Sequence, residues 1–248
     1  MNIPLHALYI SNKYSKVLKS ITKINHIGFI MDGNRRWAKH RFLSPISGHK
    51  KGLNTMHKII NYAVKKLHIK AMSFYAFSTE NWNRNNDEIN YLMNLMKDQL
   101  NDSKFENWLM ENNVQFIWNG FENKLDNLII EKAKYLMNKT INNTGTKLQV
   151  LLNYGSQQKV VEAINNILLE QSKSIDLSIL MNKLDPFNLG SIDLLIRTGN
   201  EKRLSNFMLL ESSYAELIFH RCYWPSYSIS KLNFDLIEFL NRKRRFGK

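Results

Sequence analysis

An acidic residue, a glycine, an amide and two arginines follow a short apolar run in the stretch HIGFIMDGNRRW at residues 26–37. Apolar residues that end in Asp32-Gly33 are typical of a buried strand entering a turn, and RRWAKHR after them has helix-forming character. Backbone N–H groups at a helix start can bind an anion, and an arginine adds a bidentate donor for phosphate. A bare carboxylate repels phosphate unless a divalent cation lies between them. An ordinary Asp-Gly turn with solvated arginines explains these residues alone equally well.

Comparable polar clusters follow other apolar runs of the chain. Runs rich in β-branched and aromatic residues predict strands at 27–31, 71–77, 114–118, 148–152, 192–196 and 217–219. Helical periodicity predicts helices at 52–67, after a turn at Gly48-His49, and at 88–112, 124–138, 158–171 and 205–216. This alternation indicates an α/β domain with a largely parallel central sheet flanked by helices. The polar clusters at 32–34, 78–82, 153–155 and 197–199 then share the edge where such sheets bind ligands.

The composition narrows the class of partner. The 248 residues carry a formal net charge of +14, which favours an anionic partner such as phosphorylated small molecules, an acidic membrane face or nucleic acid. The single cysteine, Cys222, excludes an internal disulfide and fits a reducing compartment. Residues 1–25 form a basic lead-in that either packs as a helix on the domain or lies on a membrane surface, and 26–248 form one domain. No apolar segment approaches the ~18 residues of a membrane span.

Several common ligand-binding motifs are missing from the sequence. It contains neither G-x-x-x-x-G-K-[ST] nor G-x-G-x-x-G, so neither the nucleoside triphosphate nor the dinucleotide cradle is supported. It also lacks Asp-Asp-x-x-Asp, the metal-diphosphate motif of trans-type prenyl synthases, and a Cys/His cluster for zinc.

A set of longer motifs resembles the cis-prenyltransferases, the family of undecaprenyl and dehydrodolichyl diphosphate synthases. The motifs occur in the family's order: HIGFIMDGNRRWAK, SGHKKG, FSTENWNR, NYG, LIRTGNEKRLSNFMLLESSYAE, YWP at 223–225 and RKRRFG. The resemblance implies a cis-prenyltransferase fold, with a hydrophobic tunnel leading from a diphosphate site into the core. It also implies repeated condensation of isopentenyl diphosphate onto an allylic diphosphate, usually farnesyl diphosphate, with Mg²⁺ as cofactor. The product would be a long-chain polyprenyl diphosphate for a glycosyl carrier lipid of undecaprenyl or dolichol type.

The resemblance also assigns roles to residues. It implies that Asp32, Asn34, His49 and Ser78 are catalytic, and that Asp32 and Glu216 hold magnesium. The implied substrate-binding residues are Gly33, Arg35, Arg36, Trp37, Phe77, Glu80, Asn81, Trp82, Arg84, Arg197, Arg203, Ser205, Arg245 and Gly247.

Within that set, residues 33–36 are expected to cradle the allylic diphosphate and residues 197–205 the diphosphate of isopentenyl diphosphate. His49 would donate a proton or hydrogen bond to the leaving diphosphate. The sequence leaves three candidates for the group that accepts the proton released after condensation: Asn34, Ser78 and the departing diphosphate. For Phe77, packing is as good an interpretation as substrate contact, and Ser78 to Asn81 also fit helix capping. The apolar helix faces between 92 and 109 line the tunnel or simply form core.

The carboxyl terminus predicts how the protein assembles, and positions that differ from the family pattern bear on its activity. Arg245-Phe246-Gly247 matches an ending that, in homodimeric family members, reaches the neighbouring subunit's site, so we expect a homodimer. We also expect a cytoplasmic protein in peripheral membrane contact through its apolar product, at the endoplasmic reticulum in a eukaryote. Departures from the family pattern occur at Pro45, Gln157, Asn200, Leu210 and Glu211.

Two alternatives accompany the leading hypothesis of an active enzyme. One is a non-catalytic partner subunit of the same fold, although such subunits lose the aspartate and arginines that this chain keeps. The other, suggested by charge alone, is a basic nucleic-acid-binding protein. We expect no nucleic acid, since diphosphates and a membrane surface account for the same charge.

Overall fold

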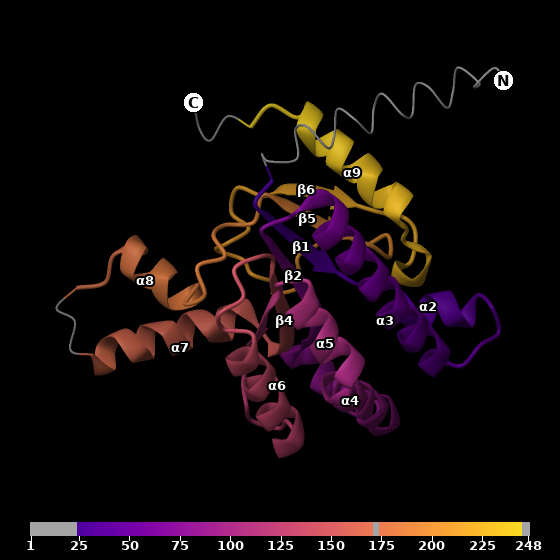
Figure 1. Cartoon of the computed structure of the whole chain (residues 1–248), viewed down its shortest axis with the longest axis horizontal. Coiled ribbons are helices and arrows are strands. Elements are labelled where there is room, and N and C mark those ends of the chain that lie inside the picture. The colour runs from indigo at the N-terminus through magenta and orange to yellow at the C-terminus, as the bar shows by residue number, and fades with distance from the viewer. Residues whose placement is uncertain (1–23, 171–173, 245–248) are drawn as a thin grey trace.

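The computed structural model describes residues 24–170 and 174–244. Within them, parallel strands form a six-stranded sheet in the order β3-β4-β2-β1-β5-β6 (Figure 1). The strands are β1 (His26–Ile30), β2 (Ala71–Ser78), β3 (Gln115–Asn119), β4 (Lys147–Tyr154), β5 (Leu194–Arg197) and β6 (Glu216–Phe219). The predicted parallel sheet and its strands are confirmed.

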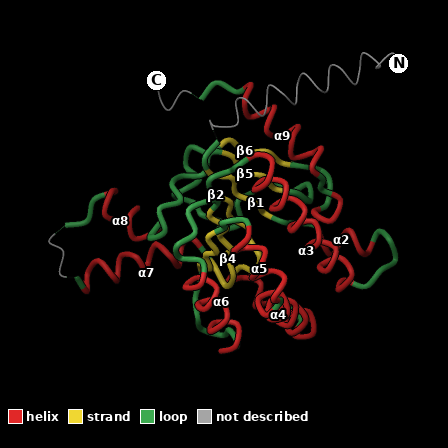
Figure 2. The backbone as a smooth tube through the Cα atoms, in the orientation of Figure 1, coloured by secondary structure: helices red, strands yellow, loops and turns green. Residues whose placement is uncertain are grey.

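Helices flank the sheet and connect most successive strands, whereas turns alone connect β5 to β6 (Figure 2). The α-helices are α2 (Asn34–Lys39), α3 (Pro45–Tyr62), α4 (Asn86–Asn101), α5 (Ser103–Glu111), α6 (Asn127–Lys139), α7 (Ser156–Leu169), α8 (Leu177–Leu184) and α9 (Ile229–Asn241). Shorter helical turns are η2 (Ala63–Leu67), η3 (Thr79–Asn83) and η4 (Trp224–Ser226). In Figure 1, α7 and α8 project from the body as an arm.

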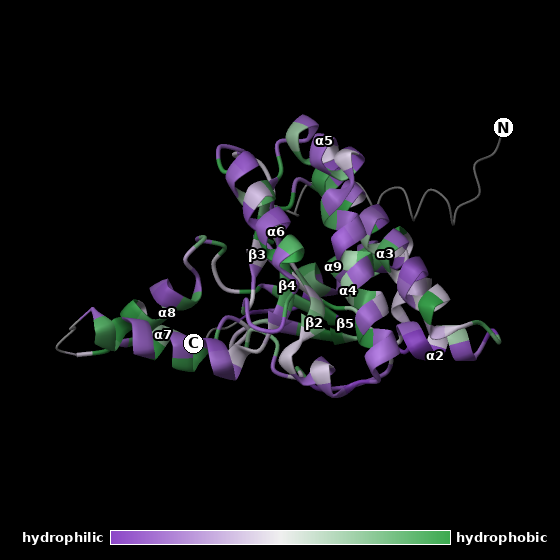
Figure 3. Ribbon diagram, turned by 90° about the horizontal axis from the view of Figure 1, so that it is seen from below, coloured by the Kyte–Doolittle hydropathy of each residue, from purple (hydrophilic) through white to green (hydrophobic). Residues whose placement is uncertain are grey.

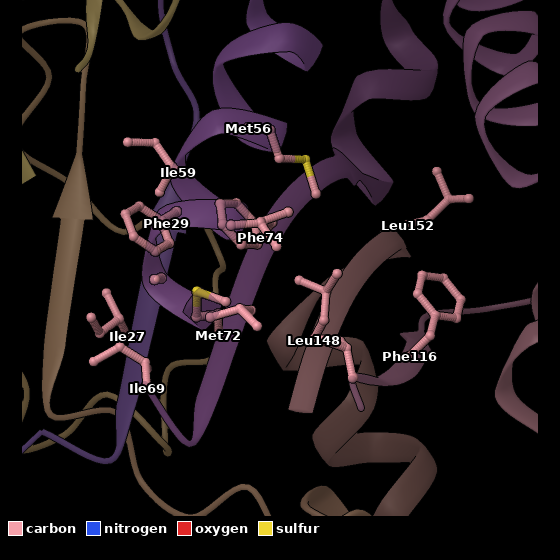
Figure 4. Packing of buried hydrophobic residues seen from close by; sticks show 14 of the residues in the cluster. Ile27, Phe29, Met56, Ile59, Ile69, Met72, Phe74, Phe116, Leu148 and Leu152 are labelled. Atoms are coloured by element: carbon pink, nitrogen blue, oxygen red, sulfur yellow. The ribbon is translucent and has the colours of Figure 1, made fainter. Parts of the chain in front are cut away.

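The larger core lies between the sheet and the helices on one of its faces. Phe29 of β1 and Phe74 of β2 stack with ring centroids 4.7 Å apart. Met56 and Ile59 of α3 belong to the same buried cluster (Figure 4). Every residue of β1 is buried, which is why its sequence after His26 runs on without polar residues instead of alternating.

The predicted helix at 205–216 is wrong. Ser205, Asn206 and Met208 have positive φ angles of 50°, 63° and 33°, and an α-helix excludes that conformation. The segment forms turns instead, and Phe207 and Met208 are buried against the second face of the sheet. The apolar residues of 205–216 therefore reflect burial without helical geometry.

Other helix boundaries also differ from the expectation. The stretch 88–112 forms two helices because it breaks at Asp102, whose side chain caps α5 by accepting from the Lys104 N–H. Gly48-His49 is not a turn but lies inside α3, which begins earlier, at Pro45 after the Ser44 cap. The short α8 and the carboxyl-terminal α9 were not predicted.

No described helix is both long and apolar enough to cross a membrane. Most of the expected lead-in at 1–25 lies outside the described residues.

Candidate active site

A polar cleft opens at the carboxyl ends of β1, β2 and β5. Its space amounts to about 2270 Å³, open solvent at the mouth included. Thirteen of the residues expected from the sequence line it: Asp32, Gly33, Asn34, Arg35, Arg36, His49, Ser78, Glu80, Asn81, Arg84, Arg197, Arg203 and Ser205. The structure thus gathers side chains from three separate parts of the chain, as the rule for parallel sheets predicts.

Asp32 lies between two arginines. Its Oδ1 is 3.0 Å from Arg36 Nη2, and its Oδ2 is 3.0 Å from Arg197 Nη2. The Thr198 hydroxyl donates to the Asp32 carbonyl at 2.7 Å, and the Trp224 N–H donates to the same oxygen at 3.0 Å. The aspartate backbone is therefore fixed by the β5 loop and by η4, while its carboxylate orients two guanidinium groups toward one point.

Two glycines allow the loops that follow β1 and β5 to pack closely against their neighbours. Gly33 has a φ of 100° and precedes α2, and a Cβ there would lie 2.6 Å from Tyr223 Cδ1. Gly199 has a φ of 89°, and a Cβ there would lie 2.8 Å from Arg36 Nη2. Asn200 follows with a φ of 62°, so the asparagine in place of the usual family residue keeps the left-handed turn.

Arg197 anchors the second basic loop. It is 4% exposed, and its Nη1 donates to Ser205 Oγ at 2.7 Å and to the Arg203 carbonyl at 2.5 Å. Its Nε has no acceptor among the described residues. Arg203 is far more exposed and pairs with Glu201 at 2.6 Å, while Glu201 also accepts from Arg36 at 3.1 Å. Glu201 therefore links the two basic loops.

A second ionic cluster centres on Glu88, at the start of α4. This carboxylate lies 2.9 Å from Arg84, 3.4 Å from Arg35 and 3.3 Å from His49 Nε2. Burial lowers the pKa of His49, against the opposing effect of the Glu88 charge. The imidazole is therefore neutral at pH 7, and a neutral ring can still donate a hydrogen bond from one of its nitrogens.

Ser78 and Asn34 occupy the floor of the cleft. Ser78 caps η3, and its own N–H donates to Asn81 Oδ1 at 3.2 Å, so the expected capping is confirmed. Asn34 donates from Nδ2 to the Met31 carbonyl, while its buried Oδ1 has no partner among the described residues. An orphaned buried acceptor in a cleft is a common sign of a bound group that satisfies it.

An apolar tunnel begins at the floor of this cleft. It is a narrow space with a cavity volume of about 100 Å³, lined mainly by α3, α4 and the adjoining strands. Cleft and tunnel share the residues Met31, Asn34, His49, Tyr75, Ala76 and Leu92. The apolar faces of α4 and α5 contribute Leu95, Met96, Leu100 and Phe105, so the tunnel interpretation of these residues is supported.

Two polar side chains interrupt the tunnel wall away from the cleft. His57 stacks on Phe105 with ring centroids 6.1 Å apart, and Gln99 lines the same wall. Burial lowers the pKa of His57, which leaves the ring neutral at pH 7, against the opposing effects of Asp102 and Gln99. The Gln99 Nε2 has no acceptor among the described residues.

Four expected residues lie elsewhere. Trp37 donates to Ser226 Oγ at 2.8 Å, and Phe77 is buried against Trp82, which itself donates to Asn153. Glu216 starts β6, level with Leu194 at the amino end of β5, and pairs with Arg242. Within one protomer it is thus at the opposite end of the sheet from Asp32.

The expected contacts of Arg245 and Gly247 fall outside the described residues. The roles that the resemblance implies for these two residues, and for Glu216 in holding magnesium, stay predictions.

Sequence reasoning missed Tyr75, Glu201 and Asn206. The Tyr75 hydroxyl donates to the carbonyls of Tyr154 and Ser205, both at 3.2 Å, which ties β2 to the second basic loop. A register shift follows Tyr75 in β2, so strict alternation along the strand could not show that Tyr75 and Phe77 face different clusters. The Asn206 side chain accepts from the Gln157 N–H and donates to Glu80, a link across the cleft with no sequence signal.

The acidic side chains of the cleft fit a magnesium diphosphate better than a preformed metal centre. No group of three or more His, Cys, Asp or Glu side chains in the described part of the chain could hold a metal ion. Mg²⁺ in diphosphate enzymes needs only one or two carboxylates together with substrate oxygens, and Asp32 supplies one.

The cleft joins a cluster of arginines to an apolar tunnel, a combination suited to an anionic head group with an apolar chain, and comparison with known proteins identifies the family. Residues 30–247 match the family model described as "Putative undecaprenyl diphosphate synthase". The chain belongs to this family of cis-prenyltransferases, and it is a transferase that elongates prenyl chains.

Individual relatives agree with this assignment. An isoprenyl transferase of Staphylococcus haemolyticus is 40% identical over 228 residues, which cover 90% of this chain and 88% of the relative. The crystal structure of lavandulyl diphosphate synthase from Lavandula x intermedia, in complex with dimethylallyl diphosphate, has a TM-score of 0.86 and 29% identity, covering 91% of this chain and 98% of that one. A "probable undecaprenyl diphosphate synthase" from Campylobacter jejuni has a TM-score of 0.77 and 30% identity, with 91% and 99% covered.

Proposed function

We propose that this enzyme condenses isopentenyl diphosphate repeatedly onto an allylic diphosphate, with farnesyl diphosphate as the starting substrate. The observation that carries the proposal is the continuity of the basic cleft with the apolar tunnel. A diphosphate held by arginines at the junction would place its prenyl chain among apolar side chains. The product is proposed to be a polyprenyl diphosphate long enough for a glycosyl carrier lipid.

The two basic loops suit two diphosphates. Arg36 and the backbone around Gly33 and Asn34 are proposed to hold the allylic diphosphate beside the tunnel mouth. Arg197, Arg203 and Ser205 are proposed to hold isopentenyl diphosphate. The allylic C–O bond breaks, its carbon joins the terminal carbon of isopentenyl diphosphate, and a proton leaves the new chain. Fixed guanidinium groups stabilise the negative charge that the departing diphosphate acquires.

Magnesium is proposed to bind at Asp32 together with diphosphate oxygens. It would supply positive charge that neutralises the leaving group. When a diphosphate enters, Arg36 and Arg197 are close enough to redirect N–H groups from the Asp32 carboxylate to the diphosphate oxygens. His49 is placed to donate to the same group once its charged form is favoured by the bound anion.

We further propose a homodimer that works in the cytoplasm. Support comes from the projecting arm of α7 and α8, on which Val161, Leu168, Leu169 and Leu177 are each more than half exposed. Apolar residues gathered on a projecting arm are typical of a subunit interface. Neither alternative from the sequence, a non-catalytic subunit or a nucleic-acid-binding protein, has a specific observation in its favour.

The test is a turnover assay with the full-length protein. It is incubated with Mg²⁺, labelled isopentenyl diphosphate and either farnesyl or dimethylallyl diphosphate, and the extracted lipids are separated by chain length. We expect a long polyprenyl series from farnesyl diphosphate, and its loss in Asp32→Ala at an unchanged melting temperature. An inactive wild type, or an Asp32→Ala variant with normal turnover, would contradict the proposal.

A further inference from the structure

The region that follows Asp32 carries only positive charge. Residues 33–79 contain ten lysines and arginines and no aspartate or glutamate. Arg35 and Arg36 pair with carboxylates of the cleft clusters. In contrast, Lys39, Lys50 and Lys58 are exposed and form no ion pair with any described residue. The last two lie eight residues apart on the outer face of α3, so the positive charge continues along that helix.

The loop between α2 and α3, together with the first residues of α3, adds exposed apolar residues to this basic region. Phe42 is 100% exposed, and Leu43 and Ile46 are 45% and 46% exposed. We call residues 40–46 the Phe42 loop. Figure 3 shows it at the outer edge of the molecule, beyond α2.

The backbone of the Phe42 loop is held in place. The Phe42 N–H donates to the Lys39 carbonyl, and the Leu43 N–H donates to the Ala38 carbonyl at 3.0 Å. Phe42 itself has a φ of 55°, a conformation that phenylalanine rarely adopts. The fold therefore maintains a strained turn whose apolar side chain is fully exposed.

We propose that the Phe42 loop and the basic outer face of α3 bind an anionic phospholipid bilayer. Phe42, Leu43 and Ile46 would enter the boundary between headgroups and acyl chains, with the lysines at the level of the headgroups. This combination of apolar tip and cationic flank is that of interfacial membrane anchors.

Charge and shape favour lipid over other occupants. A second copy binding through the same surface would bring lysines against lysines, which is repulsive. A nucleic acid would use the cations but leave the apolar tip exposed. The proposal also agrees with the position of the loop, because Phe42 and Leu43 line the mouth of the cleft. Docking there would bring that mouth to the lipid surface, where an apolar product can leave.

The test measures vesicle binding without turnover, so it can fail independently of the proposed function, which it extends. The full-length chain is sedimented with phosphatidylcholine vesicles that either contain or lack phosphatidylglycerol. Three variants are compared with the wild type: Phe42→Ser, the double variant Lys50→Glu/Lys58→Glu, and Ile141→Ser. Ile141 is a matched control because it is 60% exposed and lies after α6, in a different part of the molecule.

We expect the wild type to bind only the anionic vesicles. Phe42→Ser should bind them roughly tenfold more weakly or worse, since burial of a phenylalanine ring favours association by more than a factor of ten. The lysine variant should lose the preference for anionic lipid, and Ile141→Ser should bind as the wild type does. Equal binding by Phe42→Ser and wild type would overturn the proposal. So would an equal loss in Ile141→Ser, or binding to a DNA duplex but not to vesicles.

Discussion

Glu211 is a buried carboxyl group whose replacement by glutamine should stabilise the protein. The side chain is 2% exposed, and its Oε2 has no hydrogen-bond partner among the described residues. Burial raises the pKa of this carboxyl from 4.5 to about 7. The family motif usually has glutamine here, so Glu211→Gln restores a neutral side chain of the same shape.

The size and sign of the effect follow from the two pKa values. The carboxyl of the unfolded chain ionises near 4.5, while the folded chain holds its proton up to about 7. The contribution of Glu211 to the free energy of unfolding is therefore most favourable below pH 4.5, and it falls as the pH rises toward 7. The pKa difference of about 2.5, at about 1.4 kcal/mol for each pKa unit, corresponds to a loss of roughly 3–4 kcal/mol above pH 7. Glutamine cannot ionise and escapes this loss.

Urea denaturation of wild type and Glu211→Gln at several pH values between 5 and 8 measures the difference directly. The two proteins should have similar free energies of unfolding at pH 5, and the variant should be more stable by roughly 2–3 kcal/mol at pH 8. Glu131→Gln is the control, since that side chain on α6 is exposed and forms no ion pair with any described residue. If Glu211→Gln is no more stable than wild type at pH 8, the reasoning is wrong.

Four further outcomes are expected. Arg203→Ala should raise the apparent KM for isopentenyl diphosphate roughly ten- to hundredfold and that for farnesyl diphosphate little, because a charge-assisted contact contributes ~1.5–3 kcal/mol; equal effects on both would reverse the site assignment. The Asp235 carboxylate raises the pKa of His220 to about 10, so the wild-type melting temperature should fall as the pH rises from 6.5 toward 10, and it should fall less in His220→Gln. Gln99→Leu should shift the products to longer chains, since it replaces an amide, whose Nε2 has no acceptor among the described residues, with an apolar side chain in the tunnel wall, and an unchanged series on chromatography would count against that. Deletion of residues 245–248 should cut turnover at least ~tenfold without changing the dimer, and full activity would show that the tail has no role in turnover.

The cleft was largely predictable from the sequence because polar clusters after apolar runs obey one geometric rule. Ser78 and Arg197 end strands of a parallel sheet, Asp32 follows two residues after another, and such ends meet at one edge. Capping at Ser78 and the left-handed Asn200 could be predicted for the same reason, since both depend on local chemistry.

The failures have a different physical origin. The apolar residues of 205–216 are buried by contact with the sheet, and their helical spacing did not reveal the positive φ angles that exclude a helix. The register shift after Tyr75 reverses a face assignment that strict alternation would make. The register of β6 decides where Glu216 lies, and pairing between distant strands is not encoded in local pattern.

The strand order also determines when, during synthesis, the sheet and the active site can form. β1, at the centre of the sheet, is synthesised early. Its neighbour β5 is synthesised much later, because Arg197, which pairs with Asp32, comes 165 residues further along the chain. The Trp224 N–H that fixes Asp32 comes later still. At ~5–20 residues per second, a nascent chain would carry β1 with one edge unpaired for roughly ten seconds or more. During that interval the exposed strand edge is open to wrong pairing, and chaperone protection would matter most before β5 emerges from the ribosome.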